Sequence, residues 1–438
     1  MSEIRDSRLG WAPAIPSHWQ VVPLRYVADM GTGHTPDRNK AEYWEDCTIP
    51  WVTTPDVTKR ADSFAPLLET EQKISRLGMA KSAAVLHPED TVMLSRTASI
   101  GYSVRIGRPM ATTQAFVTWK SGEKLDSRYL LMVLRAMKEE WARLAYGSTH
   151  LTIYMPDLES IRIPLPPLVE QRRIVDFIDR EVKRIDALIA ADHNYAKLLK
   201  ERQESELYAA LSGSDVAGCR VDHPMLGSLP SRWPVVKLRR LVPRVGVGVV
   251  VDPSSYFSEE GVPFLHGANI LAGKIDVRDV RRISDLDSRK LWRSRLEEGD
   301  VVVVRAGYPG RAAVITGDLD GANCASIIVL KKGKSLLPSY LAAYFNSLLG
   351  KAYVDSVRYG AAQEQINVSH VVDFMVPVPS PSEQVDITRR LDDTFRASTS
   401  MGDRIVKRSA LLAERRQALI TAAVTGQFDV TTARGADV

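Results

Sequence analysis

Apolar residues recur at steps of three and four along residues 170–212, a stretch that contains neither glycine nor proline. Such a stretch favours one uninterrupted helix, because glycine and proline are the residues that most weaken a helix interior. The three–four spacing is a heptad pattern, typical of a helix that packs lengthwise against another helix. The polar Asp192 interrupts it. The predicted seam consists of Val175, Ile178, Val182, Ile185, Ile189, Ala196 and Leu199.

A weaker form of the same pattern covers residues 383–425, where Ile405 stands at the position that Asp192 has in the first segment. Gly402 is expected to break or bend this second helix, because glycine has a low helix propensity. Since neither seam is stable in water, the two helices are expected to pack on each other in antiparallel orientation. The apolar seam positions are Leu391, Phe395, Ile405, Leu412 and Leu419, and the interruptions are Ser398, Gly402, Ser409 and Arg416.

The two helical segments belong to a longer internal repeat. The stretch Ile15–Arg25 returns as Leu229–Arg239, and Glu89–Leu94 returns as Gly299–Val304 with an offset of 210. From Tyr146 to Gly213 the offset stays at 213 without a gap. A period above 200 residues is too long for a solenoid, whose units run about 20–50 residues. Each repeat is therefore expected to be a domain with a helical appendage.

Residues 15–165 and 229–379 combine short β-rich runs with turns and short helical patches. This mixture is typical of compact, β-rich mixed α/β domains. We therefore predict two pseudo-repeated mixed α/β domains separated by two long antiparallel coiled-coil helices, with prolines stiffening each junction. The predicted segments are an N-terminal segment 1–14, a first domain 15–165, a first helical spacer 166–213, a linker 214–228, a second domain 229–379, a second helical spacer 380–427 and a C-terminal tail 428–438.

Composition narrows the class of protein without deciding it. The chain is 45% hydrophobic and 25% charged with a formal net charge of +5, which permits a polyanionic partner but does not demand one. No run of 18 apolar residues occurs, and the charged N-terminus does not resemble a signal peptide. The scattered Cys47, Cys219 and Cys324 favour a reduced, cytoplasmic protein in which all three are small buried side chains.

Catalytic signatures are missing from the sequence. It contains no P-loop, no metalloprotease helix motif and no nucleophile-elbow motif. The pairs Gly31-Thr32-Gly33 and Gly246-Val247-Gly248 are expected to form turns rather than nucleotide-binding loops. Neither histidines nor cysteines cluster at metal-ligand spacing. A duplicated chain of this kind favours a binding protein that is not an enzyme and holds no metal or cofactor of its own.

Three motifs together resemble the specificity subunits of type I restriction-modification systems. Each half begins with Pro-Ser-x-Trp, at Pro16–Trp19 and Pro230–Trp233. Each domain ends in a Pro-x-Pro stretch that leads to Glu-Gln, at Pro164–Gln171 and Pro377–Gln384. The C-terminal helix ends at Leu419–Gly426 in the manner of the family. The resemblance covers nearly the whole chain, from about Trp11 to Phe428.

The resemblance implies that the two domains are target-recognition domains, each of which contacts one half of a split, asymmetric site in double-stranded DNA. It implies that the helical spacers dock two adenine-methylating modification subunits, and that restriction subunits join for phage defence. S-adenosylmethionine, ATP and Mg²⁺ would be bound by these partner subunits. Two similar domains on a stiff pair of helices also predict half-sites about one helical turn apart, with unread base pairs between them.

Base-contacting residues cannot be carried over from the family, so candidates come from polar loop positions. Gln and Asn can bond adenine through two hydrogen bonds, and Arg can bond guanine. The alternative for each residue is strand capping or ordinary surface polarity. The candidates in the first half are Arg96, Thr97, Thr112, Thr113, Gln114, Ser148, Thr149, His150, Thr152 and Tyr154. Those in the second half are Arg305, Tyr308, Asn323, Gln363, Gln365 and Asn367. In the repeat, Thr112, Thr113 and Gln114 are matched to Asn323, Cys324 and Ala325.

The densest basic stretch of the chain lies between residues 278 and 295, where acidic residues dilute it, and a solvated helix face is the favoured interpretation. Its members are Arg278, Arg281, Arg282, Arg289, Lys290, Arg293 and Arg295.

Two other classes of protein remain open. The first is a scaffold without DNA affinity, in which two ligand-binding domains on a coiled coil organise partner proteins. The second is a self-sufficient fused methyltransferase and endonuclease, which the missing cofactor loop and the missing Asn-Pro-Pro-type motif oppose.

Overall fold

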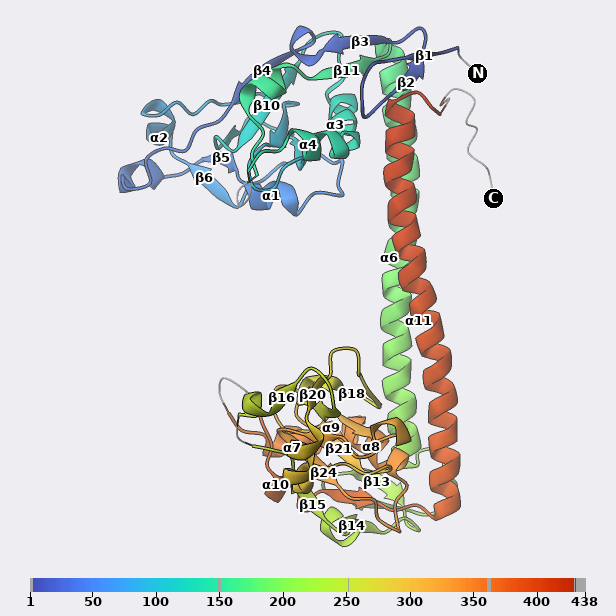
Figure 1. Cartoon of the computed structure of the whole chain (residues 1–438). Helices are drawn as coiled ribbons and strands as arrows, with labels where there is room; N and C mark the ends of the chain where they lie inside the picture. Colours follow the sequence, from blue (N-terminus) through green and yellow to red (C-terminus); the bar gives the residue numbers. More distant parts are fainter. Residues whose placement is uncertain (1–2, 148–150, 251, 361–363, 429, 431–438) are drawn as a thin grey trace. The chain divides into compact units, whose positions relative to one another are not determined.

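The computed structural model describes residues 3–147, 151–250, 252–360, 364–428 and 430. Its contacts divide the chain into two compact units. Unit 1 comprises Met1–Asp192 and Lys407–Val438, and unit 2 comprises His193–Val406. Each unit therefore contains one of the predicted domains together with parts of two long helices, α6 (Leu168–Ser212) and α11 (Pro381–Val424) (Figure 1).

Unit 1 is built on a four-stranded antiparallel sheet in the order β4-β10-β7-β8, beside a three-stranded sheet β6-β5-β9 and the strand pairs β1-β2 and β3-β11. The strands are β1 (Ile4–Asp6), β2 (Ala14–Pro16), β3 (Gln20–Pro23), β4 (Ala28–Thr32), β5 (Ile49–Val52), β6 (Gln72–Ile74), β7 (Val92–Ser95), β8 (Ser103–Arg105), β9 (Ala111–Thr112), β10 (Phe116–Ser121) and β11 (Arg162–Leu165). The helices are η1 (Leu24–Tyr26), η2 (Ala41–Trp44), α1 (Thr54–Thr58), α2 (Arg76–Ala80), α3 (Ser127–Ala136), α4 (Lys138–Leu144) and α5 (Met155–Glu159).

The core of unit 1 forms where α3 packs on the four-stranded sheet. Strand β7 is paired on both edges, with β10 and β8, and its residues are buried along its whole length. Helix α3 buries six consecutive residues, Tyr129–Leu134, against this sheet and against the first turns of α6. Ile420, Ala423 and Val424 of α11 complete the same apolar cluster. The last turns of α11 and the first turns of α6 thus pack against the same domain (Figure 1).

Unit 2 repeats this arrangement, with a sheet in the order β15-β24-β21-β22 and a second sheet β16-β20-β17-β23. The strands are β12 (Arg220–His223), β13 (Gly227–Pro230), β14 (Val235–Lys237), β15 (Val245–Val247), β16 (Phe257–Ser258), β17 (Val262–Leu265), β18 (Ile270–Leu271), β19 (Lys274–Ile275), β20 (Arg281–Ile283), β21 (Val301–Val304), β22 (Ala312–Val314), β23 (Asn323–Cys324), β24 (Ile327–Leu330) and β25 (Met375–Pro377). The helices are η3 (Leu238–Arg240), η4 (Ser254–Tyr256), η5 (Gly267–Asn269), α7 (Asp285–Lys290), η6 (Trp292–Ser294), η7 (Gly317–Leu319), α8 (Pro338–Asn346), α9 (Leu348–Val357) and α10 (Val368–Val372).

The two predicted long helices are confirmed, and they are antiparallel. In unit 1 the start of α6 meets the end of α11, and in unit 2 the end of α6 shares a core cluster with the start of α11. On α6 the predicted seam residues are buried near the start, half-buried at Ile189 and Leu199, and exposed at Ala196. The buried ones are Val175, Ile178, Val182 and Ile185. On α11, Leu391 and Ile405 are buried, whereas Phe395, Leu412 and Leu419 are half-buried.

Of the two effects expected at Gly402, a break or a bend, the break is wrong. Helix α11 runs through Gly402 without interruption. A glycine in a helix costs only about 0.5–1 kcal/mol relative to alanine. The burial of Leu391 and Ile405 on either side offsets that cost, because burying one such side chain contributes about 1.5–3 kcal/mol.

The polar interruption of the first seam is buried rather than solvated. Asp192 is fully buried at the end of the unit 1 part of α6. Its carboxylate pairs with Arg408 of α11, whose Nε lies 2.9 Å from Oδ2, and accepts a hydrogen bond from Ser409 at 3.2 Å. A buried polar group on a helix seam is stable only when its partner lies opposite it, so this pair favours a single register of the two helices.

Strand pairing corrects the alignment of the two repeats by one residue. Val92 pairs with Arg105 in unit 1, and Val301 pairs with Val314 in unit 2, so β7 and β21 are related by an offset of 209 and not 210. Further on, Val52 faces Thr112 across parallel strands, and Leu265 faces Cys324. The equivalent of Thr112 is therefore Cys324 and not Asn323. A shift of one residue matters, because it turns a side chain to the other face of a strand.

The expectation that the two glycine pairs form turns is wrong. Gly31 and Gly246 lie within β4 and β15, and the second glycine of each pair follows directly after its strand. A Cβ atom on Gly33 would lie 2.1 Å from the Thr112 carbonyl oxygen, and one on Gly248 would lie 2.4 Å from that of Cys324. Both second glycines therefore allow two backbone segments to approach closely.

Two expectations about single residue types also need correction. Only Cys324 is a buried cysteine, and burial raises the pKa of its thiol to about 12. Cys47 is half-buried and Cys219 is exposed. The basic stretch 278–295 is not one helix face either, because Arg281 and Arg282 lie on strand β20 and only Arg289 and Lys290 lie on α7.

Candidate nucleic-acid interface

In unit 1, three segments meet at the end of the central strand β7. Thr97, just after the strand, forms a bridge with Thr152, and Thr152 forms a second bridge with Tyr146. The Arg96 carbonyl accepts a hydrogen bond from the Ile153 amide at 2.8 Å. Tyr146 and Tyr154 are about half exposed, and their ring centroids lie 5.9 Å apart. We call this cluster (Arg96, Thr97, Tyr146, Thr152 and Tyr154) the unit 1 junction.

The same three segments meet in unit 2 with different side chains. Ala306 forms a bridge with Gln365, and Gln365 forms a second bridge with Tyr359. The Arg305 carbonyl accepts a hydrogen bond from the Ile366 amide at 2.9 Å. We call Arg305, Ala306, Tyr359, Gln365 and Asn367 the unit 2 junction. The backbone is thus equivalent in the two units, whereas Thr152 and Tyr154 are replaced by Gln365 and Asn367.

The predicted residues of the first half differ in how far their polar groups are available. Thr112 is fully buried and donates to the Val52 carbonyl at 3.0 Å. The Arg96 guanidinium donates to the carbonyls of Gln114 and Ile153 at 3.2 and 3.3 Å. The Thr113 hydroxyl accepts from the Ala115 amide. Exposed Gln114 accepts a hydrogen bond from Thr35 at 2.6 Å. Arg96 therefore supports the backbone of the unit 1 junction, and Thr112 supports that of strand β5.

The predicted residues of the second half separate in the same way. Asn323 is fully buried, where its amide bonds Ser288, Ser294 and the Leu291 carbonyl. The side chain of Asn367 caps α10, and its Oδ1 accepts from the Tyr359 hydroxyl at 2.7 Å.

Three predicted residues of this half keep uncommitted groups. Tyr308 is 63% exposed, and the Arg311 guanidinium lies 3.7 Å from its ring centroid. Arg305 and Gln365 are half-buried, and their side chains have no hydrogen bond or ion pair among the described residues. These two are therefore the predicted residues of unit 2 with the most available polar groups.

Four predicted residues lie outside the described residues. They are Ser148, Thr149 and His150 in unit 1, and Gln363 in unit 2.

Sequence reasoning missed Thr35, Tyr146, Tyr359 and Arg311. The repeated dipeptides Tyr146-Gly147 and Tyr359-Gly360 were the available signal for the two tyrosines. For Thr35 and Arg311 there was none, because only folding brings Thr35 to Gln114 and places Arg311 over Tyr308.

The motifs shared by the two halves form a clamp between domain and helix. In unit 1, the Trp19 indole and the His18 ring each lie 3.0 Å from the Glu170 carboxylate, in the first turn of α6. In unit 2, Glu383 of α11 accepts from Trp233 at 3.1 Å and from Arg232 at 2.7 Å. Burial acts to raise the pKa of Glu383, but hydrogen bonds from Ser380, Arg232 and Trp233 outweigh it and hold that pKa at about 2.

The glutamine that follows each glutamate completes the clamp. Gln171 is fully buried, accepts from the Asp126 amide at 2.9 Å, and donates to the carbonyls of Lys124 and Pro166. Gln384 makes the equivalent three bonds to Leu337, Ser335 and Pro379. Gln171 and Gln384 thus hold the domains to their helices, and their side-chain amides are occupied by these bonds.

A glycine at the end of each long helix packs against the tryptophan of one Pro-Ser-x-Trp motif, Gly213 against Trp233 and Gly426 against Trp19. Gly213 and Gly426 follow α6 and α11 with φ of +62° and +70°, which suits a helix end in the left-handed conformation. A Cβ on Gly213 would lie 2.6 Å from Pro230 and 2.8 Å from Trp233, and one on Gly426 would lie 2.3 Å from Pro16. The end of α11 therefore supports the first domain as the end of α6 supports the second.

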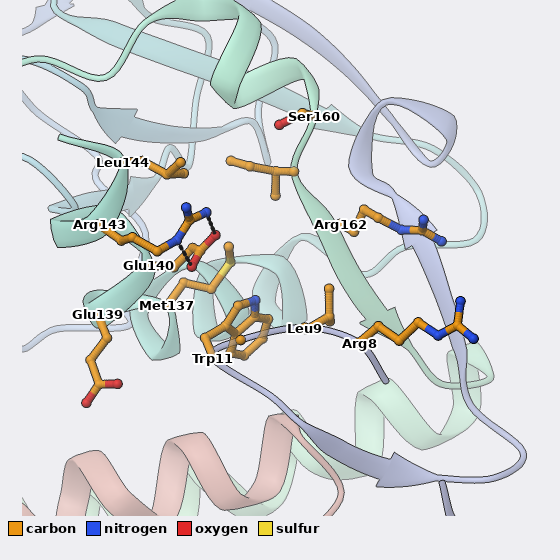
Figure 2. A pocket seen from close by; sticks show the side chains of 12 residues that line it. Arg8, Leu9, Trp11, Met137, Glu139, Glu140, Arg143, Leu144, Ser160 and Arg162 are labelled. Carbon is orange, nitrogen blue, oxygen red and sulfur yellow. Dashed lines mark hydrogen bonds and ion pairs between the residues drawn. The ribbon is translucent and has the colours of Figure 1, made fainter. Parts of the chain in front are cut away.

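A cavity of about 490 Å³ in unit 1 lies away from the junction (Figure 2). The loop Arg8–Trp11, helix α4 and Ser160–Arg162 line it, and none of the predicted residues does. Glu140 and Arg143, three residues apart on α4, point toward each other in its lining, with two hydrogen bonds of 2.9 and 2.6 Å. No group of three or more potential metal ligands is found among the described residues. None of the helices in the described ranges is long and apolar enough to cross a bilayer.

Two copies of one mixed α/β fold, each clamped to two long antiparallel helices and each with its own exposed junction, define a duplicated recognition protein. Residues 16–194 match the family model described as the type I restriction modification DNA specificity domain. The chain is a specificity subunit of the type I restriction-modification family, which carries DNA target specificity and is itself non-catalytic.

Relatives and solved structures agree with this assignment. The chain is 22% identical to the EcoKI specificity subunit of Escherichia coli K12, over 95% of this chain and 90% of the relative. It is 24% identical to the StySPI specificity subunit of Salmonella potsdam, over 87% and 83%. The fold is similar to a chain from a structure on complex assembly and conformational transition of the type I R-M system (TM-score 0.72, 18% identity, 94% and 99% covered). It is also similar to the HsdS subunit from Thermoanaerobacter tengcongensis (TM-score 0.56, 18% identity, 94% and 98% covered).

Proposed function

We propose that this chain directs a type I restriction-modification complex to a bipartite, asymmetric DNA target. One target-recognition domain, residues 15–165, contacts one half-site, and the other, residues 229–379, contacts the second. The observation that supports this most is the pair of junctions. Their bridges are equivalent, but Thr152 and Tyr154 occupy in unit 1 the positions that Gln365 and Asn367 occupy in unit 2. Equivalent backbones with different side chains suit two half-sites of different sequence.

The candidates for base contact are the exposed or half-buried side chains in or beside each junction. In unit 1 these are Thr97, Gln114, Thr152 and Tyr154, and in unit 2 they are Arg305, Tyr308 and Gln365. The residues with committed polar groups, Thr112, Asn323 and Asn367, support the backbone in this proposal. Arg305 suits a guanine and Gln365 suits an adenine, because each can make two hydrogen bonds to that base in the major groove.

The helices are the docking surface for the partners in this proposal. Apolar side chains that a helix in water would not favour are exposed on both α6 and α11, including Leu188, Leu198, Val406 and Leu411. Exposed apolar positions of this kind are typical of protein interfaces. Two modification subunits would bind there in the cytoplasm, and restriction subunits would join them. S-adenosylmethionine, ATP and Mg²⁺ would be bound by those partners.

Mapping methylated adenines in the DNA of cells that carry the complete system tests the proposal. The wild-type chain should yield one split motif with two different halves. Gln365→Ala should relax the half contacted by unit 2 alone, and the matched variant Thr152→Ala should relax the other half alone. Equal loss at both halves would refute the modular assignment. A scaffold without DNA affinity would give a purified assembly with no preference among duplexes at physiological salt.

A further inference from the structure

An arginine lies over a pair of aromatic rings beside the unit 1 junction. Trp44 and Trp51 meet edge to face, with centroids 5.3 Å apart. The Arg38 guanidinium carbon lies 5.4 Å from the Trp44 centroid and 5.6 Å from that of Trp51. Trp51 is fully buried, Trp44 is half-buried and Arg38 is exposed, so the tryptophans form a fixed base under a solvent-facing cation. We call these three residues the unit 1 platform.

Unit 2 has a similar platform, in which two phenylalanines replace the two tryptophans and the arginine lies over one of them. Phe257 and Phe264 also meet edge to face, with centroids 5.9 Å apart, and the Arg281 guanidinium carbon lies 4.6 Å from the Phe257 centroid. Phe264 is fully buried, Phe257 is half-buried and Arg281 is exposed. The unit 2 platform therefore consists of Arg281, Phe257 and Phe264.

The two platforms occupy equivalent places in the two folds. Trp51 pairs with Ala111 on parallel strands in unit 1, and Phe264 pairs with Asn323 in the same way in unit 2. The neighbouring loops carry the same turn, in which an aspartate side chain accepts from the amide two residues later. The bonds run from Asn39 to Asp37 at 3.0 Å and from Ser254 to Asp252 at 2.9 Å.

The arginine, however, comes from a different place in the chain in each unit. Arg281 lies on β20, directly opposite Phe264. The residue opposite Trp51 on the equivalent strand β6 is Gln72. Unit 1 instead supplies its cation from Arg38, in the loop after β4. The two units thus place a cation at equivalent locations from two unrelated sequence positions. The strand pairing does not explain this, because the strands pair without either arginine.

Both cations are available to a ligand and lie near the junctions. Among the described residues, neither guanidinium has an ion pair or a hydrogen bond. The loop that carries Arg38 is tied to the unit 1 candidates by the bond between Thr35 and Gln114. In unit 2, the His266 ring packs 5.3 Å from Phe264, and a Cβ on the next residue, Gly267, would lie 3.9 Å from the Ala306 carbonyl oxygen of the junction.

We propose that Arg38 and Arg281 bind backbone phosphates of the DNA duplex next to the half-site that each unit contacts. This inference rests on the proposed function and adds the residues that hold the duplex without contributing sequence preference. Arginine suits the role because its flat guanidinium can stack on an aromatic ring and still donate to phosphate along its edge. Phosphate contacts position a protein on DNA, whereas base contacts specify the sequence.

The test is a salt titration of DNA binding by the complete assembly purified from cells, with a duplex that carries the mapped methylation motif and with a random duplex. Each phosphate contact contributes a slope of about −0.9 to log K against log salt. Arg38→Gln and Arg281→Gln should each reduce the slope by about that amount on both duplexes, so a fourfold rise in salt should cost each variant about 3.5-fold less affinity than it costs wild type. The methylation motif should stay unchanged.

Two further variants separate this role from a structural one. Arg25→Gln is the matched control, because Arg25 also lies over an exposed ring, that of Tyr26 at 5.5 Å. The substitution removes the same charge from unit 1. Its slope should equal that of wild type. Arg38→Gln combined with Gln72→Arg recreates the unit 2 arrangement in unit 1, and it should restore the slope.

Each outcome decides between the ideas. Wild-type slopes in Arg38→Gln and Arg281→Gln, or a loss equal to that of Arg25→Gln, would overturn this inference while leaving the proposed function intact. A loss of slope that Gln72→Arg does not restore, together with a lowered melting temperature, would assign the arginines to folding. Absence of any sequence preference in the wild-type assembly would instead refute the proposed function. Unchanged DNA binding with loss of a partner subunit would make the platforms protein interfaces.

Discussion

Replacing Gln171 with methionine tests whether the clamp between domain and helix stabilises unit 1. Methionine keeps the length and volume of the side chain but makes none of the three hydrogen bonds of the glutamine, which run to Asp126, Lys124 and Pro166. Each such bond contributes about 1 kcal/mol net, and each buried backbone group left without a partner costs at least as much. We therefore expect Gln171→Met to lower the free energy of unfolding by about 3 kcal/mol.

Differential scanning calorimetry of the full chain measures the effect. For a domain of about 150–250 residues, 1 kcal/mol shifts the melting temperature by about 2–4 °C, so the transition that reports unit 1 should move down by about 6–12 °C. Gln384→Met should do the same in unit 2, because its three bonds are equivalent. Gln20→Met, at an exposed position on β3, is the control for the side-chain change itself.

A melting temperature for Gln171→Met within about 1 °C of the Gln20→Met control would refute the argument, since that corresponds to less than about 0.5 kcal/mol. It would mean that water replaces the glutamine at no net cost. Hydrogen exchange of the Asp126 amide provides a local check, because this amide should lose protection in Gln171→Met even if the melting temperature changes little.

Three other changes test the long helices and the clamp between domain and helix. Because the pKa of Glu383 is held at about 2, below its ordinary value of 4.5, its contribution to stability is present above pH 4.5 and is lost as the pH falls toward 2. Glu383→Gln should therefore lower the urea midpoint at pH 7. If the midpoints of wild type and Glu383→Gln differed equally at pH 7 and pH 2.5, this reasoning would be contradicted. Asp192→Leu should leave stability unchanged or raise it, because it removes a buried carboxylate from the seam while its partner Arg408, whose side chain is 63% exposed, stays solvated, and a loss above about 1 kcal/mol in chemical denaturation would contradict that expectation. Gly402→Ala should stabilise α11 by about 0.5–1 kcal/mol, since a Cβ there meets nothing within 4 Å, and a lowered melting temperature would show that the glycine is needed.

The long helices were predictable because their signal is local and repeated. Residues 170–212 contain no helix-breaking residue, and Val175, Ile178 and Val182 follow one face closely enough to identify a seam. The error at Gly402 has a physical reason. Propensity is a cost of about 1 kcal/mol at one residue, and packing along the rest of the helix decides whether that cost matters.

The candidate interface was predictable only in part. The repeat correctly indicated that Thr152 and Gln365 occupy equivalent places, and both lie in the junctions. It could not indicate that Thr112 and Asn323 are both fully buried, because their burial depends on segments far away in the sequence that cover these short strands. The platforms could not be predicted at all, since Arg38 and Arg281 reach the same place from positions that no alignment relates.

The sequence by itself determined the duplication, the mixed α/β domains, the two long helices and the family resemblance. Each of these depends on the order and periodicity of residues along the chain, which is a property of the sequence. Only the tertiary structure decided which polar groups remain available to a ligand, such as the Arg305 guanidinium, and which make hydrogen bonds inside the fold, such as the Asn323 amide. That distinction depends on which residues meet across segments far apart in the chain, and the physical reason is that a buried polar group must find a partner wherever folding places one.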